Sequence, residues 1–235
     1  MNPTWTKRLH RLAPVLLGLV VAGCTSLLRS NVPPVQVYTL RAADDASADG
    51  TAEAHSAVAA SLRVAHPLAG PGLGSSGIVL LQPDHRMNVY AASAWASDAP
   101  TLVEAVVSQR LRATGQWSSV EDAESPFPSD YLLQISIRRF EADYSAGGAV
   151  PPTVHVTLDC ALGAEEGRTV LSSFVAEGSA VAGANKLSEV VAAFQQATDQ
   201  AVASLSQQAF AAVRGTASPR SGSRSERRSS PRGGT

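Results

Sequence analysis

Several patterns that would assign this 235-residue chain to a known chemistry are missing from its sequence. It has no G-x-S-x-G nucleophile motif, no H-E-x-x-H pair and no phosphate-binding P-loop. After the first 23 residues, no apolar run approaches the roughly 20 residues that a membrane-spanning helix needs. These absences argue against a serine hydrolase, a zinc hydrolase and an energy-coupling ATPase. Catalytic residues can also come together from distant positions in a sequence, so a periplasmic enzyme remains an alternative.

Only two cysteines are present, and the first of them, Cys24, ends a leader sequence. Basic residues within 7–11 precede the apolar run Leu12–Val20, which is typical of a secretory signal. Val21-Ala22-Gly23-Cys24 then resembles the bacterial lipobox, in which small residues precede an acylated cysteine. We therefore expect residues 1–23 to be cleaved and Cys24 to carry acyl chains that hold the protein at a membrane. The alternative is an ordinary secretory signal in which Cys24 is incidental.

The second cysteine, Cys160, lies in the alternating run 154–160, and we interpret it as a small buried apolar residue. The histidines show no metal-ligand spacing. Residues 72–77 match the dinucleotide fingerprint G-x-G-x-x-G, but an apolar strand-like run follows where that motif needs a helix. The sequence therefore indicates no cofactor and no metal.

The overall net charge of −1 hides an uneven distribution. The leader carries three basic residues and no acidic ones, and residues 214–235 carry a net charge of +5. The remaining residues, 24–213, therefore carry −9. A nucleic-acid-binding protein normally presents a basic face, so we expect no nucleic-acid partner.

Composition divides the mature chain into three parts. Residues 24–34 are a polar tether, 35–213 form one globular domain, and the Arg- and Ser-rich residues 214–235 form a disordered tail. Inside the domain, residues 42–60 read as a flexible insertion, because they contain almost no large apolar side chain.

The hydrophobic pattern of the domain predicts an α+β fold. Alternating residues indicate strands and 3.6-residue periodicity indicates helices. We expect a mostly antiparallel sheet of about six strands in consecutive hairpins, with two helices packed on one face. The candidate extended segments from which these strands would come are 35–40, 62–65, 78–82, 87–92, 117–120, 131–140, 154–162 and 169–181, and the expected helices are 102–111 and 187–213.

One short segment combines several residue types that are enriched at interfaces. Met87, Val89, Tyr90 and Trp95 lie close together just before the first helix. We take Met87, Tyr90 and Trp95 as a candidate partner interface and expect at most two of the four side chains to be exposed. Burial against the sheet is the alternative for Trp95.

The order of these features resembles a known family, the auxiliary lipoproteins of ABC-type transport systems. This group contains the outer-membrane lipoprotein of the paraquat-inducible Pqi system. The matching features are the lipobox at Cys24, Tyr38-Thr39-Leu40, Met87-Asn88-Val89-Tyr90 with Trp95, and Tyr131-Leu132-Leu133-Gln134-Ile135. The resemblance covers about residues 24–213 and includes the alanine-rich final helix.

The resemblance implies a non-enzymatic component of an envelope transport system. Its partners would be an MCE-domain periplasmic protein, an inner-membrane permease and an ATPase, which together move lipids or other hydrophobic molecules. Self-association into a homo-oligomer is a further expectation. Thr25 follows the lipidated cysteine, so we expect the periplasmic face of the outer membrane, with the inner membrane as the alternative. The competing interpretation is a structural or secretion-assembly lipoprotein of the envelope.

Overall fold

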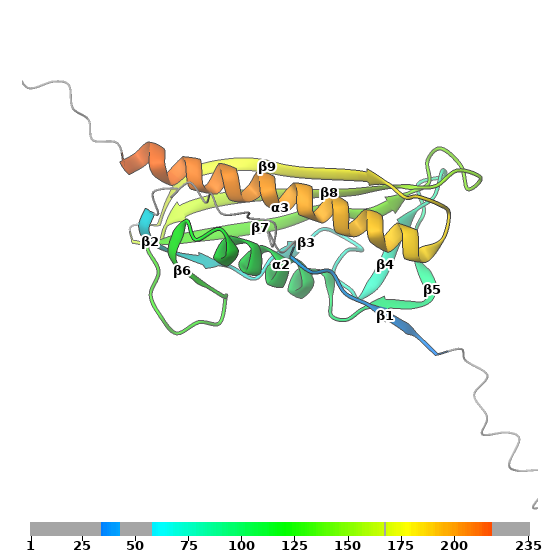
Figure 1. Cartoon of the computed structure of the whole chain (residues 1–235), viewed down its shortest axis with the longest axis horizontal. Coiled ribbons are helices and arrows are strands. Elements are labelled where there is room, and N and C mark those ends of the chain that lie inside the picture. Colours follow the sequence, from blue (N-terminus) through cyan, green and yellow to red (C-terminus); the bar gives the residue numbers. More distant parts are fainter. Residues whose placement is uncertain (1–33, 43–57, 167, 218–235) are drawn as a thin grey trace, which may run out of the picture. The chain divides into compact units, whose positions relative to one another are not determined.

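The computed structural model describes residues 34–42, 58–166 and 168–217. The described sheet and helices lie within Gln36–Thr235 (Figure 1). Four predicted features lie wholly or mostly outside the described residues: the signal sequence, the lipidation site Cys24, most of the insertion and residues 218–235 of the tail.

Nine strands and two helices follow one another in the described part of the chain. They are β1 (Gln36–Tyr38), β2 (Val58–Val64), β3 (Leu68–Ala69), β4 (Gly77–Leu81), β5 (Met87–Trp95), α2 (Ala99–Ala113), β6 (Trp117–Glu121), β7 (Tyr131–Asp143), β8 (Thr153–Ala164), β9 (Thr169–Val181) and α3 (Leu187–Ala217).

Strand β7 organises the sheet. One of its edges pairs antiparallel with β8 along its whole length, and β8 pairs in turn with β9. Three short strands share the other edge, all parallel to β7: β2 at its start, β3 at its middle and β4 at its end. Strand β6 lies outside β2, while β5 and then β1 lie outside β4.

The prediction of a mostly antiparallel, six-stranded sheet was wrong in strand number and in direction. The sheet has nine strands within the described residues, and five of its eight pairings are parallel. Alternation along a sequence shows which face a side chain occupies, but it shows neither the partner of a strand nor its direction. Strand β2 pairs only in parallel, with β6 and with β7. Strand β4 forms an antiparallel hairpin with β5, but its other edge pairs in parallel with β7, far along the chain.

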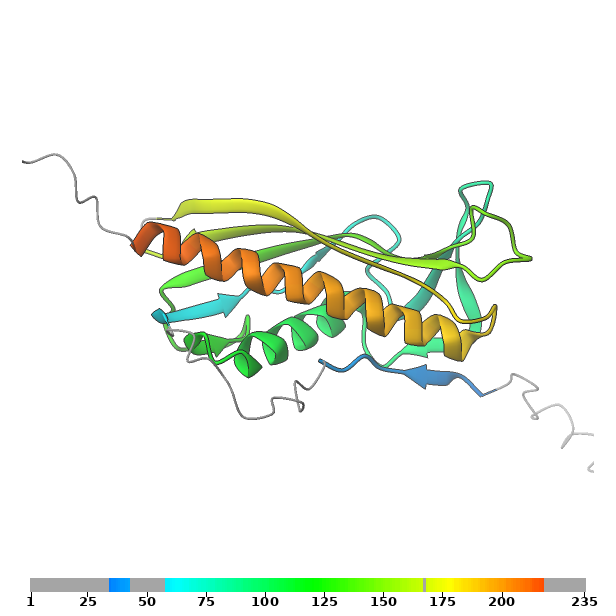
Figure 2. The same ribbon diagram turned by 45° about the horizontal axis from the view of Figure 1, so that its top comes forward.

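Both helices lie on one face of the sheet, as expected (Figure 2). Asp98 caps α2, because its carboxylate accepts a hydrogen bond from the Thr101 N–H at 2.8 Å. Helix α3 crosses β8 and β9, and it reaches Ala217 instead of ending at Val213. The first residues assigned to the tail therefore belong to this helix.

Small residues bring α3 very close to β9. A Cβ atom at Gly178 would overlap the backbone carbonyl of Ala197 and would lie 2.9 Å from the Ala201 nitrogen. Both alanines are fully buried. The alanine-rich face of α3 therefore packs against the sheet backbone itself.

Candidate functional site

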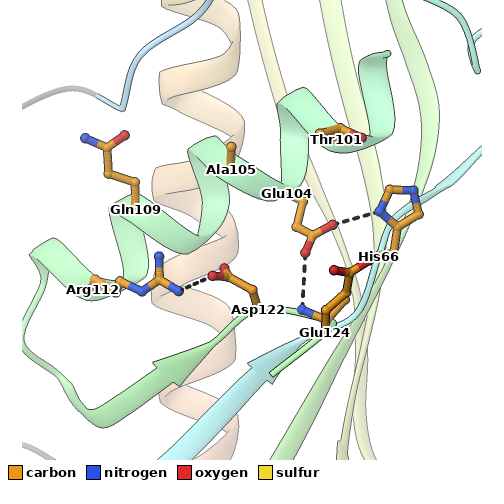
Figure 3. Close-up of a pocket in the computed structure, with 9 residues that line it drawn as sticks. His66, Thr101, Glu104, Ala105, Gln109, Arg112, Asp122 and Glu124 are labelled. Carbon is orange, nitrogen blue, oxygen red and sulfur yellow. Dashed lines mark hydrogen bonds and ion pairs between the residues drawn. The ribbon is translucent and has the colours of Figure 1, made fainter. Parts of the chain in front are cut away.

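A cleft lined by both polar and apolar atoms lies beside α2. It has a volume of about 650 Å³ and lies between α2, the end of β2 and the chain that leaves β6 (Figure 3). Its lining mixes acidic, basic and amide side chains: His66, Thr101, Glu104, Ala105, Gln109, Arg112, Asp122, Ala123 and Glu124.

Glu104 connects the two walls of this cleft. One carboxylate oxygen lies 2.7 Å from Nδ1 of His66, and the other accepts a hydrogen bond from the Ala123 N–H at 3.2 Å. The Glu104 side chain is 15% exposed, whereas that of His66 is 55% exposed. Glu104 therefore fixes the segment after β6 to helix α2.

Arg112, two turns further along α2, makes a second connection. Its Nη2 lies 2.8 Å from a carboxylate oxygen of Asp122, and its Nε donates to the Val120 carbonyl at 3.0 Å. The guanidinium thus joins the last turn of α2 to the end of β6. Of the charged groups that line the cleft, only Glu124 has no such bond.

Most of the charged side chains that line the cleft are paired with a neighbour. The imidazole of His66 is paired with a carboxylate and not with a hydroxyl or thiol nucleophile. Within residues 34–42, 58–166 and 168–217, no three histidine, cysteine or acidic side chains converge to hold a metal ion. The cleft offers fixed charges that can hold polar groups.

The structure separates the predicted interface residues Met87, Tyr90 and Trp95. Met87 and its neighbour Val89 are exposed, at 44% and 54%. The hydroxyl of half-buried Tyr90 lies 2.8 Å from that of Tyr144, and burial together with this hydrogen bond raises the Tyr90 pKa.

Trp95 is 2% exposed and belongs to the core, so its place in the candidate interface was wrong. Cys160 is buried, as expected, and burial raises its thiol pKa to about 12. A thiol with this pKa stays protonated and unreactive at neutral pH.

The cleft could not be predicted from the sequence. Glu104 and its partner His66 lie 38 residues apart. No spacing rule connects residues on a strand end, a helix and a loop. The glycine-rich residues 72–77 lead into strand β4, which agrees with the rejection of a dinucleotide site.

Comparison with known proteins gives the family. The model of the ABC-type transport auxiliary lipoprotein component matches residues 38–206, which include helix α2, the greater part of helix α3 and eight complete strands. The chain belongs to this family. No curated protein sequence matches it significantly. Among the described residues of this auxiliary lipoprotein, no helix is long and apolar enough to cross a membrane.

Solved structures share the fold of the auxiliary lipoprotein. Protein XCC0632 from Xanthomonas campestris, of family DUF330, is 24% identical with a TM-score of 0.68, covering 80% of this chain and 100% of its own. A protein described as uncharacterized is 15% identical with a TM-score of 0.57, covering 75% and 99%. At these identities the likeness concerns the fold alone.

Proposed function

We propose that this auxiliary lipoprotein is a non-enzymatic docking component of an ABC-type system that moves lipids or other hydrophobic molecules between the inner and outer membranes. The observation that carries the proposal is the family match over residues 38–206, downstream of a lipobox at Cys24. The α2 cleft does not carry the proposal, because its Glu104 and Arg112 side chains are engaged with His66 and Asp122.

Its partners in this proposal are an MCE-domain periplasmic protein and, through it, the permease and the ATPase. Acyl chains on Cys24 anchor the protein at the periplasmic face of the outer membrane. Copies of the chain associate with one another, and exposed Met87 and Val89 on β5 offer an apolar contact for such assembly.

The anchor is tested by replacing each cysteine in cells. Cys24→Ser should abolish palmitate incorporation and release the protein from the membrane fraction. Cys160→Ser is the matched control, because Cys160 is buried and should not be acylated. Equal labelling of both variants would contradict the lipidation, and density-gradient fractionation of the wild type distinguishes the outer from the inner membrane.

The docking role is tested by purifying the native lipoprotein in mild detergent and probing for the MCE-domain protein of the same transport system. Co-purification in a constant ratio is the expected result. Sedimentation with peptidoglycan, without any transporter subunit, would favour the structural envelope role instead.

A further inference from the structure

An exposed aromatic side chain stands at the tip of the loop between β6 and β7. We call residues 122–130 the Phe127 loop. Phe127 is 65% exposed and lies between Pro126 and Pro128, which are also exposed. The two prolines have fixed φ angles and no N–H group, so the backbone around Phe127 has few alternative conformations.

Arg63 on β2 holds the tip of this loop from beneath. Its Nη1 donates to the Ser125 carbonyl at 2.7 Å, its Nη2 donates to the Phe127 carbonyl, and its Nε donates to the Ser129 hydroxyl at 3.3 Å. The Arg63 side chain is only 16% exposed. One planar guanidinium therefore ties three points of the loop to the sheet.

Both stems of the loop are fixed as well. Asp130 accepts hydrogen bonds from the Ser61 N–H and hydroxyl, at 2.7 and 2.8 Å. On the other stem, Arg112 binds Asp122 and Glu104 binds the Ala123 N–H, which are the contacts that close the α2 cleft. The structure thus fixes the backbone that carries the solvent-exposed Phe127 side chain, and this preorganisation favours binding.

The Phe127 loop lies far from the point where the anchor segment joins the sheet. Strand β1, which the chain reaches from Cys24, and strand β6, from which the loop leaves, stand at opposite ends of the strand order. Figure 1 shows the loop and β1 at opposite ends of the sheet. The loop and the strand that follows the anchor segment therefore occupy different ends of the sheet.

The surroundings of Phe127 are acidic. Glu124 and Asp130 are exposed on the loop, and the exposed pair Glu165–Glu166 lies beside it, because the Glu165 N–H donates to the Asp130 carbonyl at 3.0 Å. Basic side chains lie there as well, but they are fewer than the carboxylates: exposed Arg168 is in the same turn as this pair, Arg63 lies 3.8 Å from Glu165, and Arg112 is paired with Asp122. An aromatic side chain surrounded by carboxylates is complementary to an apolar pocket that has basic groups around its edge. The same carboxylates are repelled by anionic lipid.

We propose that the Phe127 loop binds the periplasmic partner of the transport system by inserting Phe127 into an apolar pocket with a basic rim. This inference rests on the proposed function, since that function supplies the partner. Interface energy concentrates in a few central aromatic side chains, so replacement of Phe127 should weaken binding far more than replacement of other exposed apolar residues.

The test uses the full lipidated chain in mild detergent and the MCE-domain protein of the same system, with Kd measured by biolayer interferometry. Phe127→Ala should raise Kd about tenfold or more. Val181→Ala is the matched control, because Val181 is 67% exposed and lies at the far end of β9 from the Glu165–Glu166 turn. Its Kd should stay within about twofold of wild type.

Arg63→Gln tests whether fixing the loop contributes to binding, as distinct from the contact that Phe127 makes. The variant keeps the Phe127 side chain but removes the guanidinium that binds the loop. Its Kd should also rise, with the thermal melting point measured in parallel. Because Phe127 is exposed, Phe127→Ala keeps the inference testable even if Arg63→Gln does not fold.

The outcomes separate this inference from the proposed function. Binding by wild type that Phe127→Ala leaves unchanged overturns the inference and keeps the function. Failure of wild type to bind the MCE-domain protein overturns both. Sedimentation with vesicles of phosphatidylethanolamine and phosphatidylglycerol is the third arm: vesicle binding that depends on Phe127 would assign the loop to a membrane and overturn the protein-docking inference.

Discussion

The indole of Trp95 packs edge-on against the ring of Phe194, with centroids 5.1 Å apart and ring planes 80° apart. Phe140 completes the cluster, at 5.8 Å from Trp95 and 5.2 Å from Phe194. These three side chains come from β5, β7 and α3, which lie far apart in the sequence. The cluster therefore joins β5 to the central strand β7 and to the covering helix α3.

Trp95→Ala should strongly destabilise the domain. Removing a buried aromatic side chain eliminates its packing and leaves a cavity, which costs about 3–5 kcal/mol. Urea denaturation followed by circular dichroism measures this change. Met87→Ala, on the same strand but 44% exposed, is the control and should cost far less. Equal stability of the two variants would contradict the assignment of Trp95 to the core.

The elements with long, regular periodicity could be predicted from the sequence. Helices α2 and α3 and strands β7 to β9 all appear where the pattern indicated them. The sequence of β7 also indicates a bulge. Every second residue is buried at Leu133, Ile135 and Ile137, but the next buried residue, Phe140, comes three positions later. The register shift between Ile137 and Arg139 is its structural counterpart.

The pairing of the short strands and the polar contacts of the site could not be predicted. A two-residue strand such as β3 is too short to alternate, and its pairing with Ser136 and Ile137 depends on the completed sheet. The contacts of Arg63 with Phe127 and of Glu104 with His66 join residues 64 and 38 positions apart. Such contacts exist only after the fold has formed.

Gly178→Ala should weaken the packing of α3 on β9. The added Cβ would overlap the Ala197 carbonyl, and a backbone atom cannot turn aside as a side chain can. Overpacking of this kind costs about 1–3 kcal/mol, occasionally more. Gly148→Ala is the matched control, since nothing lies within 4 Å of its new Cβ. Thermal denaturation compares the two, and an unchanged melting point for Gly178→Ala would contradict the close approach.

Asp98→Ala should remove the cap of α2 at a cost of about 1 kcal/mol, within a range of about 0.5–2. The hydrogen bonds from Thr101 lower the Asp98 pKa, which shows that the ionised carboxylate is the favoured acceptor. Asp98→Asn retains an acceptor and should lose much less stability. Chemical denaturation at neutral pH measures both variants. If alanine and asparagine were equivalent here, the start of α2 would not depend on this side chain.

His155 should make the domain less stable as the pH falls below about 6.5. Burial and the neighbouring charge of Arg139 lower its pKa from the ordinary 6.5, against the opposing effects of Asp143, Glu141 and Glu177. The unfolded chain therefore binds this proton more readily than the folded chain. Above 6.5 both states are neutral and His155 has no effect. Below it, proton uptake favours unfolding until the folded state is protonated as well.

His155→Gln should remove this part of the pH dependence, so that the free energy of unfolding falls less than in wild type between about pH 7 and pH 5. Urea denaturation at several pH values measures the slope. His85→Asn is the matched control: His85 is exposed in a turn with φ at +64°, a conformation that asparagine tolerates, and the variant should keep the wild-type slope. If His155→Gln kept the wild-type slope, other groups would cause the acid sensitivity. His155, whose Nε2 lies 3.9 Å from an Asp143 carboxylate oxygen, would then contribute nothing to it.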